Sequence, residues 1–196
     1  MIHIYLVRHG ETVWNRERRM QGLLDSPLTP LGEEQARRVG EALGRLIDGD
    51  DGFAIVSSPL GRARRTAAII CAEIGRDGGA IATDDRLEEI SWGAWDGLTF
   101  DEIEARDPGE LERRRRDRWN YLPPGGESYE MVAARARDWH DAATPGARLI
   151  VVAHGAVGRV IRGHHAGLSH AATLALDEPQ DAFFRLRDGR VERIPA

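Results

Sequence analysis

Short apolar runs alternate with amphipathic stretches along this chain, and the alternation predicts strands separated by helices. Buried strands are predicted at residues 2–7, 53–58, 80–84 and 149–155. Two edge-like strands are predicted at 181–187 and 190–194, around an Asp188-Gly189 turn. Strands that alternate with helices form a mainly parallel sheet covered on both faces, so the pattern favours that architecture.

The helix after the first predicted strand is indicated by its cap and by its periodicity. Thr29 is a suitable N-cap and Pro30 fits the first helical position, so a helix is expected from there to about Ile47. Its expected core-facing positions are Ala36, Val39, Leu43 and Leu46. Further helices are expected at 60–74, 99–106 and 108–118, after the N-cap Ser128, and from Gly155 to about Gly167.

These elements predict an α/β three-layer sandwich formed by one domain over residues 1–196. The segment 92–128 departs from the pattern because it is rich in Trp, Arg, Pro and Gly. We expect it to leave the sheet and overhang a site like a cap. Ligands of such sheets bind beyond the carboxyl ends of the strands, where "RHG" (8–10) and "AHG" (153–155) fall.

The composition indicates a globular protein and excludes several classes of function. A net charge of −5 gives no bulk attraction to nucleic acid or to an acidic membrane, and no apolar run approaches transmembrane length. All 27 Lys and Arg residues are arginine, so each arginine must be argued by its position. The single cysteine, Cys71, lies in an apolar helical pattern, which predicts a buried thiol and a cytoplasmic protein.

Five short motifs carry the chemistry. They are "RHGETVWN" (8–15), "SSPLGRARRT" (57–66), "LEEISWGAWDG" (87–97), "PPGGES" (123–128) and "VVAHGAVGR" (151–159). Each is weakly informative alone, but together and in this order they resemble the histidine phosphatase superfamily, the phosphoglycerate-mutase-like group, over nearly the whole chain. The third and fourth motifs favour its phosphatase-like branch.

This resemblance implies how several residues act on one phosphoryl group. His9 is implied as the nucleophile that forms a phosphohistidine, which requires one unprotonated ring nitrogen and an acceptor for the other N–H. Arg8 and Arg62 are implied to clamp phosphate oxygens, which the guanidinium fork matches. His154 is implied to contact the phosphate, and Gly155 opens a helix whose free N–H groups attract an anion.

The resemblance also implies the proton donor and the pocket lining. Asn15 matches a phosphate-pocket position, and Gln21 and Gly22 are expected on the substrate side. The family pattern of leucine, any residue and glutamate aligns Glu89 with the donor, whereas Glu88 is its solvated neighbour. The donor protonates the leaving alcohol and then activates water.

Two further clusters are interpreted without a catalytic role. The spacing of His164, His165 and His170 matches no common helical ligand pair, so neither a metal nor another cofactor is expected. The arginines 113–116 lie beside acidic residues and are interpreted as a solvated helix face. The alternative is that one of them reaches the pocket and binds a second anionic group of the substrate.

The chain is shorter than the mutases that it resembles, and segment 92–128 lacks the longer insertion of those enzymes. These features favour hydrolysis of a small phosphorylated metabolite by a histidine acid phosphatase-type enzyme. Cofactor-dependent phosphoglycerate mutase-type phosphotransfer is the alternative, and an inactive phosphate-binding relative is a third. The edge-like C-terminal strands are compatible with a homodimer without requiring one.

Overall fold

The computed structural model describes residues 2–196, with the backbone alone at Ala80, and these residues form an α/β fold around a six-stranded sheet. The strands are β1 (His3–Arg8), β2 (Ala54–Ser57), β3 (Ala82–Thr83), β4 (Arg148–Ala153), β5 (Ala182–Arg187) and β6 (Arg190–Pro195). Their order in the sheet is β3-β2-β4-β1-β5-β6. The pairs β1–β4, β2–β4 and β2–β3 are parallel, whereas β5 runs antiparallel to both β1 and β6. The predicted mainly parallel sheet is therefore confirmed.

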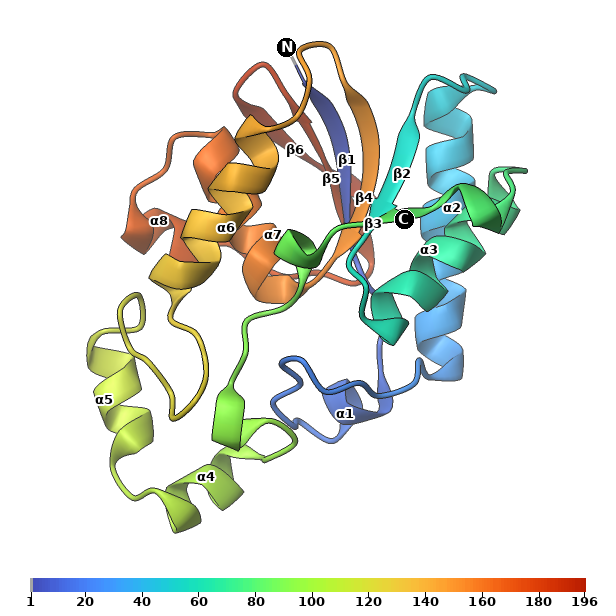
Figure 1. Cartoon of the computed structure of the whole chain (residues 1–196). Coiled ribbons are helices and arrows are strands. Elements are labelled where there is room, and N and C mark those ends of the chain that lie inside the picture. The colour runs from blue at the N-terminus through green and yellow to red at the C-terminus, as the bar shows by residue number, and fades with distance from the viewer. Residues whose placement is uncertain (1) are drawn as a thin grey trace.

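Helices cover both faces of the sheet (Figure 1). The helices are α1 (Val13–Arg16), α2 (Pro30–Ile47), α3 (Gly61–Glu73), α4 (Phe100–Arg106), α5 (Glu110–Arg116), α6 (Tyr129–Asp141), α7 (Gly155–His165) and α8 (His170–Leu174), with short 3-10 turns at Gly78–Ala80, Asp85–Leu87 and Gly93–Trp95. Figure 1 shows α2 and α3 on one face and α6, α7 and α8 on the other, which gives the three predicted layers. Both α4 and α5 lie away from the sheet, within the segment 92–128, which is called the cap segment below.

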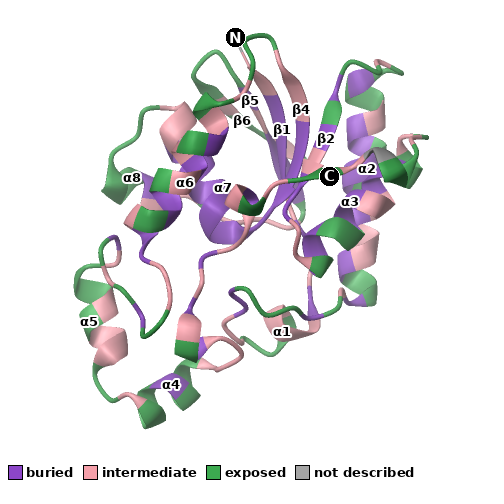
Figure 2. Cartoon of the chain, viewed as in Figure 1, coloured by how far each residue is buried: buried purple, intermediate pink, exposed green. Residues whose placement is uncertain are grey.

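The alternation of side chains along the central strands divides the core into two clusters. In β1, Ile4 and Leu6 pack in the cluster that includes α6 and α7, whereas Tyr5 and Val7 pack in the cluster that includes α2 and α3. Successive side chains of a strand point to opposite faces, so a strand buried on both sides is apolar throughout. The buried centre of the sheet and the inner helix faces are visible in Figure 2.

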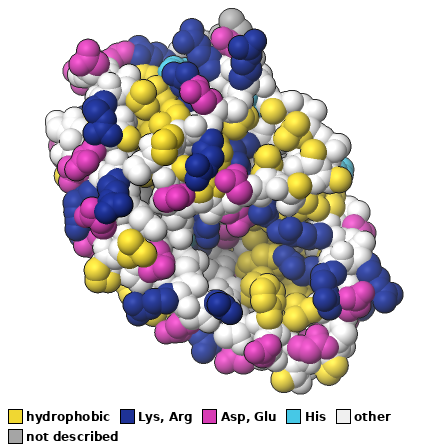
Figure 3. All heavy atoms as spheres, turned by 180° about the vertical axis from the view of Figure 1, so that it is seen from behind, with side chains coloured by type: hydrophobic (Ala, Val, Ile, Leu, Met, Phe, Trp, Pro, Cys, Tyr) yellow, Lys and Arg dark blue, Asp and Glu magenta, His cyan; other side chains and the backbone are white. Residues whose placement is uncertain are grey.

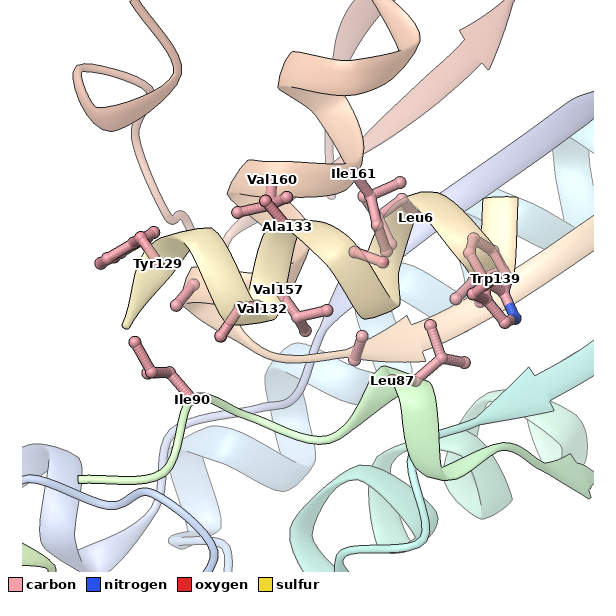
Figure 4. Packing of buried hydrophobic residues seen from close by; sticks show 14 of the residues in the cluster. Leu6, Leu87, Ile90, Tyr129, Val132, Ala133, Trp139, Val157, Val160 and Ile161 are labelled. Carbon is pink, nitrogen blue, oxygen red and sulfur yellow. The ribbon is translucent and has the colours of Figure 1, made fainter. Parts of the chain in front are cut away.

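The layer formed by α6 and α7 holds the half of the core that lies nearest the cap segment. Val132 and Ala133 of α6 pack with Val157, Val160 and Ile161 of α7 in one cluster (Figure 4). This packing fixes the N-terminal end of α7 relative to the rest of the core.

Most of the helices and strands predicted from the sequence are present, whereas two short helices were not predicted. Cys71 is buried as expected, and Thr29 and Ser128 cap α2 and α6 through their side chains. The third strand is shorter than predicted because a 3-10 turn occupies its first predicted position. The short helices α1 and α8 were not predicted.

The expectation that Leu46 faces the core is wrong. Its side chain is 42% exposed, whereas Ile47 is buried. At 3.6 residues per turn the buried stripe of α2 runs through Ala36, Val39 and Leu43 and then reaches Ile47, four residues after Leu43.

None of the helices that the structure describes combines the length and apolar character needed to cross a bilayer.

The α2 stripe provides a matched test of the packing. We predict that Leu43→Ala lowers the free energy of unfolding by about 2–5 kcal/mol, since the fully buried Leu43 would leave a cavity. The control Leu46→Ala, one turn along the same helix, is expected to change it by less than about 1 kcal/mol. Urea unfolding followed by circular dichroism measures both, and equal effects would contradict the assigned face of α2.

Candidate active site

The ends of β1 and β4 bring two histidines together at the carboxyl edge of the sheet. Arg8 pairs with Ala153 in the last step of the parallel ladder, and the His9 amide donates to the Ala153 carbonyl at 3.0 Å. The next residues along the two strands, His9 and His154, therefore leave the sheet side by side, with ring centroids 5.1 Å apart. Both imidazoles are buried.

The His9 ring is held in one tautomer. Its Nδ1 lies 2.8 Å from the carbonyl oxygen of Gly10, which can only accept, so Nδ1 carries the proton and Nε2 keeps a free lone pair. Burial, followed by the positive charges of Arg8 and Arg62, lowers the pKa of His9 well below its usual value. His9 is therefore a neutral imidazole with an available nitrogen.

Gly10 is required by a close approach of two backbones. A Cβ at Gly10 would lie 2.1 Å from the carbonyl oxygen of Gly32 in the first turn of α2, so no side chain fits there. The Gly10 amide donates to Thr66 Oγ1 at 3.1 Å. Glycine at this position lets the loop after β1 pass between α2 and α3 while it holds His9.

Arg62 lies in the first turn of α3 and is only 1% exposed. Its terminal nitrogens donate to the carbonyl oxygens of Gly22 and Leu24 at 2.7 and 2.9 Å, and Nη1 also lies 3.1 Å from Asp25 Oδ1. Burial lowers the pKa of Arg62, while the charges of Glu89 and Asp25 raise it. The guanidinium is thereby fixed in place from the loop 22–25, and its Nε has no hydrogen-bond partner in the described chain.

Hydrogen bonds also hold the side chains of Arg8 and His154. Arg8 Nη1 donates to the carbonyl oxygen of Glu178, and His154 Nε2 lies 2.8 Å from Ser58 Oγ. Within the described residues, Arg8 Nε and His154 Nδ1 are buried and lack a partner. Burial and the charge of Arg62 lower the pKa of His154 well below its usual value, so it is neutral in the free protein.

Glu89 lies against the N-terminus of α7. Its Oε1 accepts from the amides of Ile90 and Ala156 at 2.9 and 3.1 Å. Burial and the charge of Glu178 raise the pKa of Glu89, although these hydrogen bonds and Arg62 act in the opposite direction. The amides of α7, expected to attract a phosphate, thus bind the Glu89 carboxylate.

Of these residues, Arg8, His9, Arg62 and Glu89 line a cavity of about 230 Å³ between the sheet edge and the cap segment. From the main body it is lined by Arg8, His9, Asn15, Gln21, Gly22, Arg62, Glu89, Tyr129 and Glu178, and from the cap segment by Trp92, Phe100, Arg114 and Arg118, among others. Asn15, Gln21 and Gly22, the residues expected on the substrate side, are thus part of this lining. Gly155 lines a narrow neighbouring cavity together with Arg8 and His154, and Glu88 is absent from both linings.

Arg114 and Arg118 of the cap segment line the cavity. Arg114 belongs to the run 113–116, for which the sequence left open that one arginine reaches the pocket, whereas Arg118 was not considered. The Arg114 guanidinium carbon lies 4.8 Å from the centre of the Trp92 ring, and Arg118 Nη2 lies 3.2 Å from the Tyr129 hydroxyl. Among the described residues neither arginine has a carboxylate within salt-bridge distance. Burial and the charge of Arg118 lower the pKa of Arg114.

The other three arginines of the run 113–116 are solvated, as the first interpretation expected. Arg113, Arg115 and Arg116 are exposed and pair with Glu110 or Glu112. Seen from behind, arginines surround a hollow in the surface (Figure 3).

Three residues that hold the site in place, Gln180, Glu178 and Arg135, were not predicted from the sequence. Gln180 Nε2 donates to the His9 carbonyl and to Asn15 Oδ1, both at 3.1 Å. Glu178 Oε1 lies 2.8 Å from Arg159 Nη1, which also donates to the Tyr129 hydroxyl. Their only sequence signal is "DEPQ" (177–180) just before a strand, which is an ordinary loop pattern.

The third, Arg135 of α6, explains the "PPGGES" motif. Its terminal nitrogens donate to the backbone carbonyls of Glu88 and Glu89 at 2.7 and 3.1 Å. Glu127 pairs with Arg135 at 3.0 Å and accepts from the Ser91 amide at the same distance. The motif therefore supplies the carboxylate that fixes the segment carrying Glu89.

The arrangement has the parts that phosphoryl transfer needs. A neutral imidazole nitrogen can attack phosphorus, two fixed guanidinium groups can bind equatorial oxygens, and a carboxyl with a raised pKa can carry a proton. None of the residues in the cavity lining forms a cluster of His, Cys, Asp and Glu that could hold a metal; within the described chain such a cluster occurs at His140, Asp141 and His164.

Comparisons with known proteins agree with this chemistry. The family profile described as histidine phosphatase superfamily (branch 1) matches residues 4–184. A probable phosphoglycerate mutase GpmB of Salmonella paratyphi C is 36% identical over 201 residues, covering 99% of this chain and 85% of the relative. Among solved structures, the mycobacterial glucosyl-3-phosphoglycerate phosphatase in complex with VO3 has a TM-score of 0.80 and 32% identity, covering 97% of this chain and 96% of that one. YhfR of Bacillus stearothermophilus has a TM-score of 0.79 and 31% identity, covering 98% and 95%.

With the family motifs in order along the chain and their side chains gathered at one edge of the sheet, this protein belongs to the histidine phosphatase superfamily, branch 1.

Proposed function

We propose that this protein hydrolyses a phosphomonoester of a small metabolite through a phosphohistidine on His9. One observation carries the proposal. A neutral His9 lines one cavity together with the guanidinium groups of Arg8 and Arg62 and with Glu89, whose pKa burial and the charge of Glu178 raise. The nucleophile, the cations and the proton donor that phosphoryl transfer requires therefore share one space.

In the first step, His9 Nε2 attacks phosphorus and the bond from phosphorus to the leaving oxygen breaks. The proton of the Glu89 carboxyl passes to that oxygen, so the leaving group departs as an alcohol. Arg8 and Arg62 bind the equatorial oxygens, where the charge is spread in the transition state. His154 also lies beside this charge.

In the second step, Glu89 acts as a base. Its carboxylate takes a proton from a water molecule while the water oxygen attacks phosphorus and the P–N bond breaks. Inorganic phosphate leaves, His9 is neutral again and Glu89 is again protonated. No metal ion is needed in either step.

We propose that the substrate carries a second anionic group, bound by Arg114 and Arg118. Two neighbouring guanidinium groups without carboxylate partners repel each other and raise the positive potential of the cavity. An anion bound between them would offset this repulsion. Trp92 and Phe100 beside them offer apolar surface to the part of the substrate between the two anionic groups. The similarity to a glucosyl-3-phosphoglycerate phosphatase supports this substrate class.

Phosphoglycerate mutase-type transfer is the second candidate. It is favoured by the similarity to the probable mutase GpmB and by the same arginine pair, which would also bind the carboxylate of a phosphorylated acid. The two candidates share the first step and differ in the acceptor of the phosphoryl group, which is water or a second alcohol.

We also propose that residues 1–196 form a single domain and that the protein acts in the cytoplasm. The single buried thiol of Cys71 suits a reducing compartment.

The proposal predicts that the protein releases inorganic phosphate from p-nitrophenyl phosphate in the presence of a chelator. Brief reaction with ³²P-labelled substrate is expected to place label on His9, in a bond that acid cleaves and base spares. His9→Ala is expected to abolish turnover and labelling. Label that survives acid, or that appears on serine, would exclude the mechanism.

The same assay distinguishes the two candidate functions. With 2- or 3-phosphoglycerate as substrate, release of phosphate faster than interconversion of the isomers supports the hydrolase. Interconversion that outpaces release would replace the hydrolase by the mutase. No turnover, together with unchanged phosphate binding by His9→Ala, would instead indicate an inactive relative.

The two adjacent glutamates provide a test of the proton donor. We predict that Glu89→Gln lowers kcat/KM for an alkyl phosphate by about 10²–10⁴-fold, since an amide cannot deliver the proton. Glu88→Gln, at a position outside the cavity lining, is expected to have little effect. In the parent enzyme activity should fall as the pH rises through the raised pKa of Glu89, because the protonated donor is lost. The reverse ranking of the two variants would reassign the donor.

The cap arginines give a prediction about specificity. Arg114→Ala should raise KM for a phosphorylated carboxylic acid by about 10–100-fold, since a charge-assisted hydrogen bond contributes about 1.5–3 kcal/mol. KM for p-nitrophenyl phosphate, which has no second anion, should change much less. Arg115→Ala, at an exposed position of the same helix, is the control. Equal effects of Arg114→Ala on both substrates would contradict the second anion site.

A further inference from the structure

A second cluster of ionisable side chains lies where α6 and α7 end. Asp141 is the last residue of α6 and His165 the last residue of α7, and the two helices pack against each other. His140 and Asp141 come from α6, and His164 and His165 from α7. Because the histidines at 164 and 165 meet residues from another helix, their spacing along the chain does not reveal the cluster.

The donor atoms of three of these residues converge on one point. Asp141 Oδ1 lies 3.0 Å from His140 Nδ1 and 3.0 Å from His164 Nε2, and the ligand atoms of the three residues lie within 4.8 Å of one another. Ligands bound at about 2.0–2.2 Å from a zinc-class ion are themselves separated by roughly 3–3.5 Å. Asp141 is exposed and His164 is partly exposed, so rotations of these two side chains can bring the three ligand atoms around one ion.

The fourth residue of the cluster, His165, can fix the orientation of the His140 ring. His140 Nε2 lies 3.1 Å from His165 Nδ1. An imidazole that binds a metal through one nitrogen usually donates its other N–H to a fixed acceptor, which sets the tautomer and the ring orientation. Coordination through His140 Nδ1 leaves Nε2 protonated, and His165 Nδ1 can accept that hydrogen bond.

The electrostatic setting also favours a cation. Asp141 contributes a carboxylate to the cluster. The C-terminal ends of α6 and α7 add the partial negative charge of the helix dipole. Asp141 is 63% and His164 29% exposed, so an ion can enter from solvent and keep water as its remaining ligands.

We propose that His140, Asp141 and His164 form a binding site for a divalent transition-metal ion of the zinc class, which ties the ends of α6 and α7 together. Two imidazoles and one carboxylate suit Zn²⁺, Ni²⁺ or Cu²⁺ better than Mg²⁺ or Ca²⁺, which prefer oxygen ligands throughout. The site lies at the end of α7 opposite to the amides that bind Glu89, about 12 Å along the helix. Its role is therefore structural, and the proposed phosphoryl chemistry does not depend on it.

The test is a titration of the metal-stripped, tag-free protein with Zn²⁺ by calorimetry at pH 7.5. We expect one ion per chain and a higher midpoint of thermal unfolding in the presence of Zn²⁺. His164→Ala and Asp141→Asn should each weaken binding at least about tenfold and remove the thermal shift. Asp141 is exposed and His164 is partly exposed, so the unfolding midpoint without metal should stay close to that of the parent.

Two controls separate this site from others. His170→Ala removes a histidine that stacks on Trp119 outside the cluster, and it should leave Zn²⁺ binding unchanged. His9→Ala should also leave it unchanged, which excludes binding by the His9 and His154 pair. Absence of saturable binding by the parent, binding by His164→Ala and Asp141→Asn as tight as by the parent, or loss of binding in His9→Ala would each overturn the proposal. Failure of this test leaves the phosphohistidine experiment unaffected, since that assay contains a chelator.

Discussion

Arg8 and Ala153 pair in the final step of the parallel ladder between β1 and β4, so the two strands end level with each other. The chain segments that leave them begin with His9 and His154. A shift of this pairing by one residue would turn one of the two imidazoles to the opposite face, because side chains alternate along a strand. The two apolar clusters above and below the sheet fix the register, since Leu6 and Val7 must each face its own cluster. The position of the nucleophile thus depends on core packing as much as on local loop geometry.

This placement also decides the charge states in the site. The positive charges of Arg8 and Arg62 disfavour protonation of the nearby His9 imidazole and help to keep it neutral. Backbone carbonyls of Gly22, Leu24 and Glu178 accept hydrogen bonds from these two arginines without adding a full negative charge. Asp25 is the one carboxylate that pairs with either arginine among the described residues, and it contacts Arg62. The site therefore keeps a positive potential for the phosphoryl group.

The sequence was sufficient where residues follow each other along one element and insufficient where they meet from different elements. The strands and the caps of α2 and α6 could be predicted, because periodicity and local spacing encode them. The motifs that carry His9, Arg62 and His154 could be interpreted through their resemblance to a known family. Gln180 and Arg135 could not be, since their contacts with His9 and with the backbone of Glu89 join segments distant in sequence. The cap segment shows the same limit. Four consecutive arginines look alike in the sequence, and only the orientation of α5 turns Arg114 toward Trp92.

Glu89 shows how two opposing effects set the chemistry of one carboxyl. Amides at the N-terminus of α7 and the charge of Arg62 stabilise its ionised form, and alone they would lower its pKa. Burial and the charge of Glu178 favour the protonated form and outweigh them, so the pKa rises. The amides still matter, because they fix the carboxyl oxygen relative to His9 whichever form is present. A group that must first give a proton and then take one needs both: a fixed position, and two protonation states that lie close in free energy.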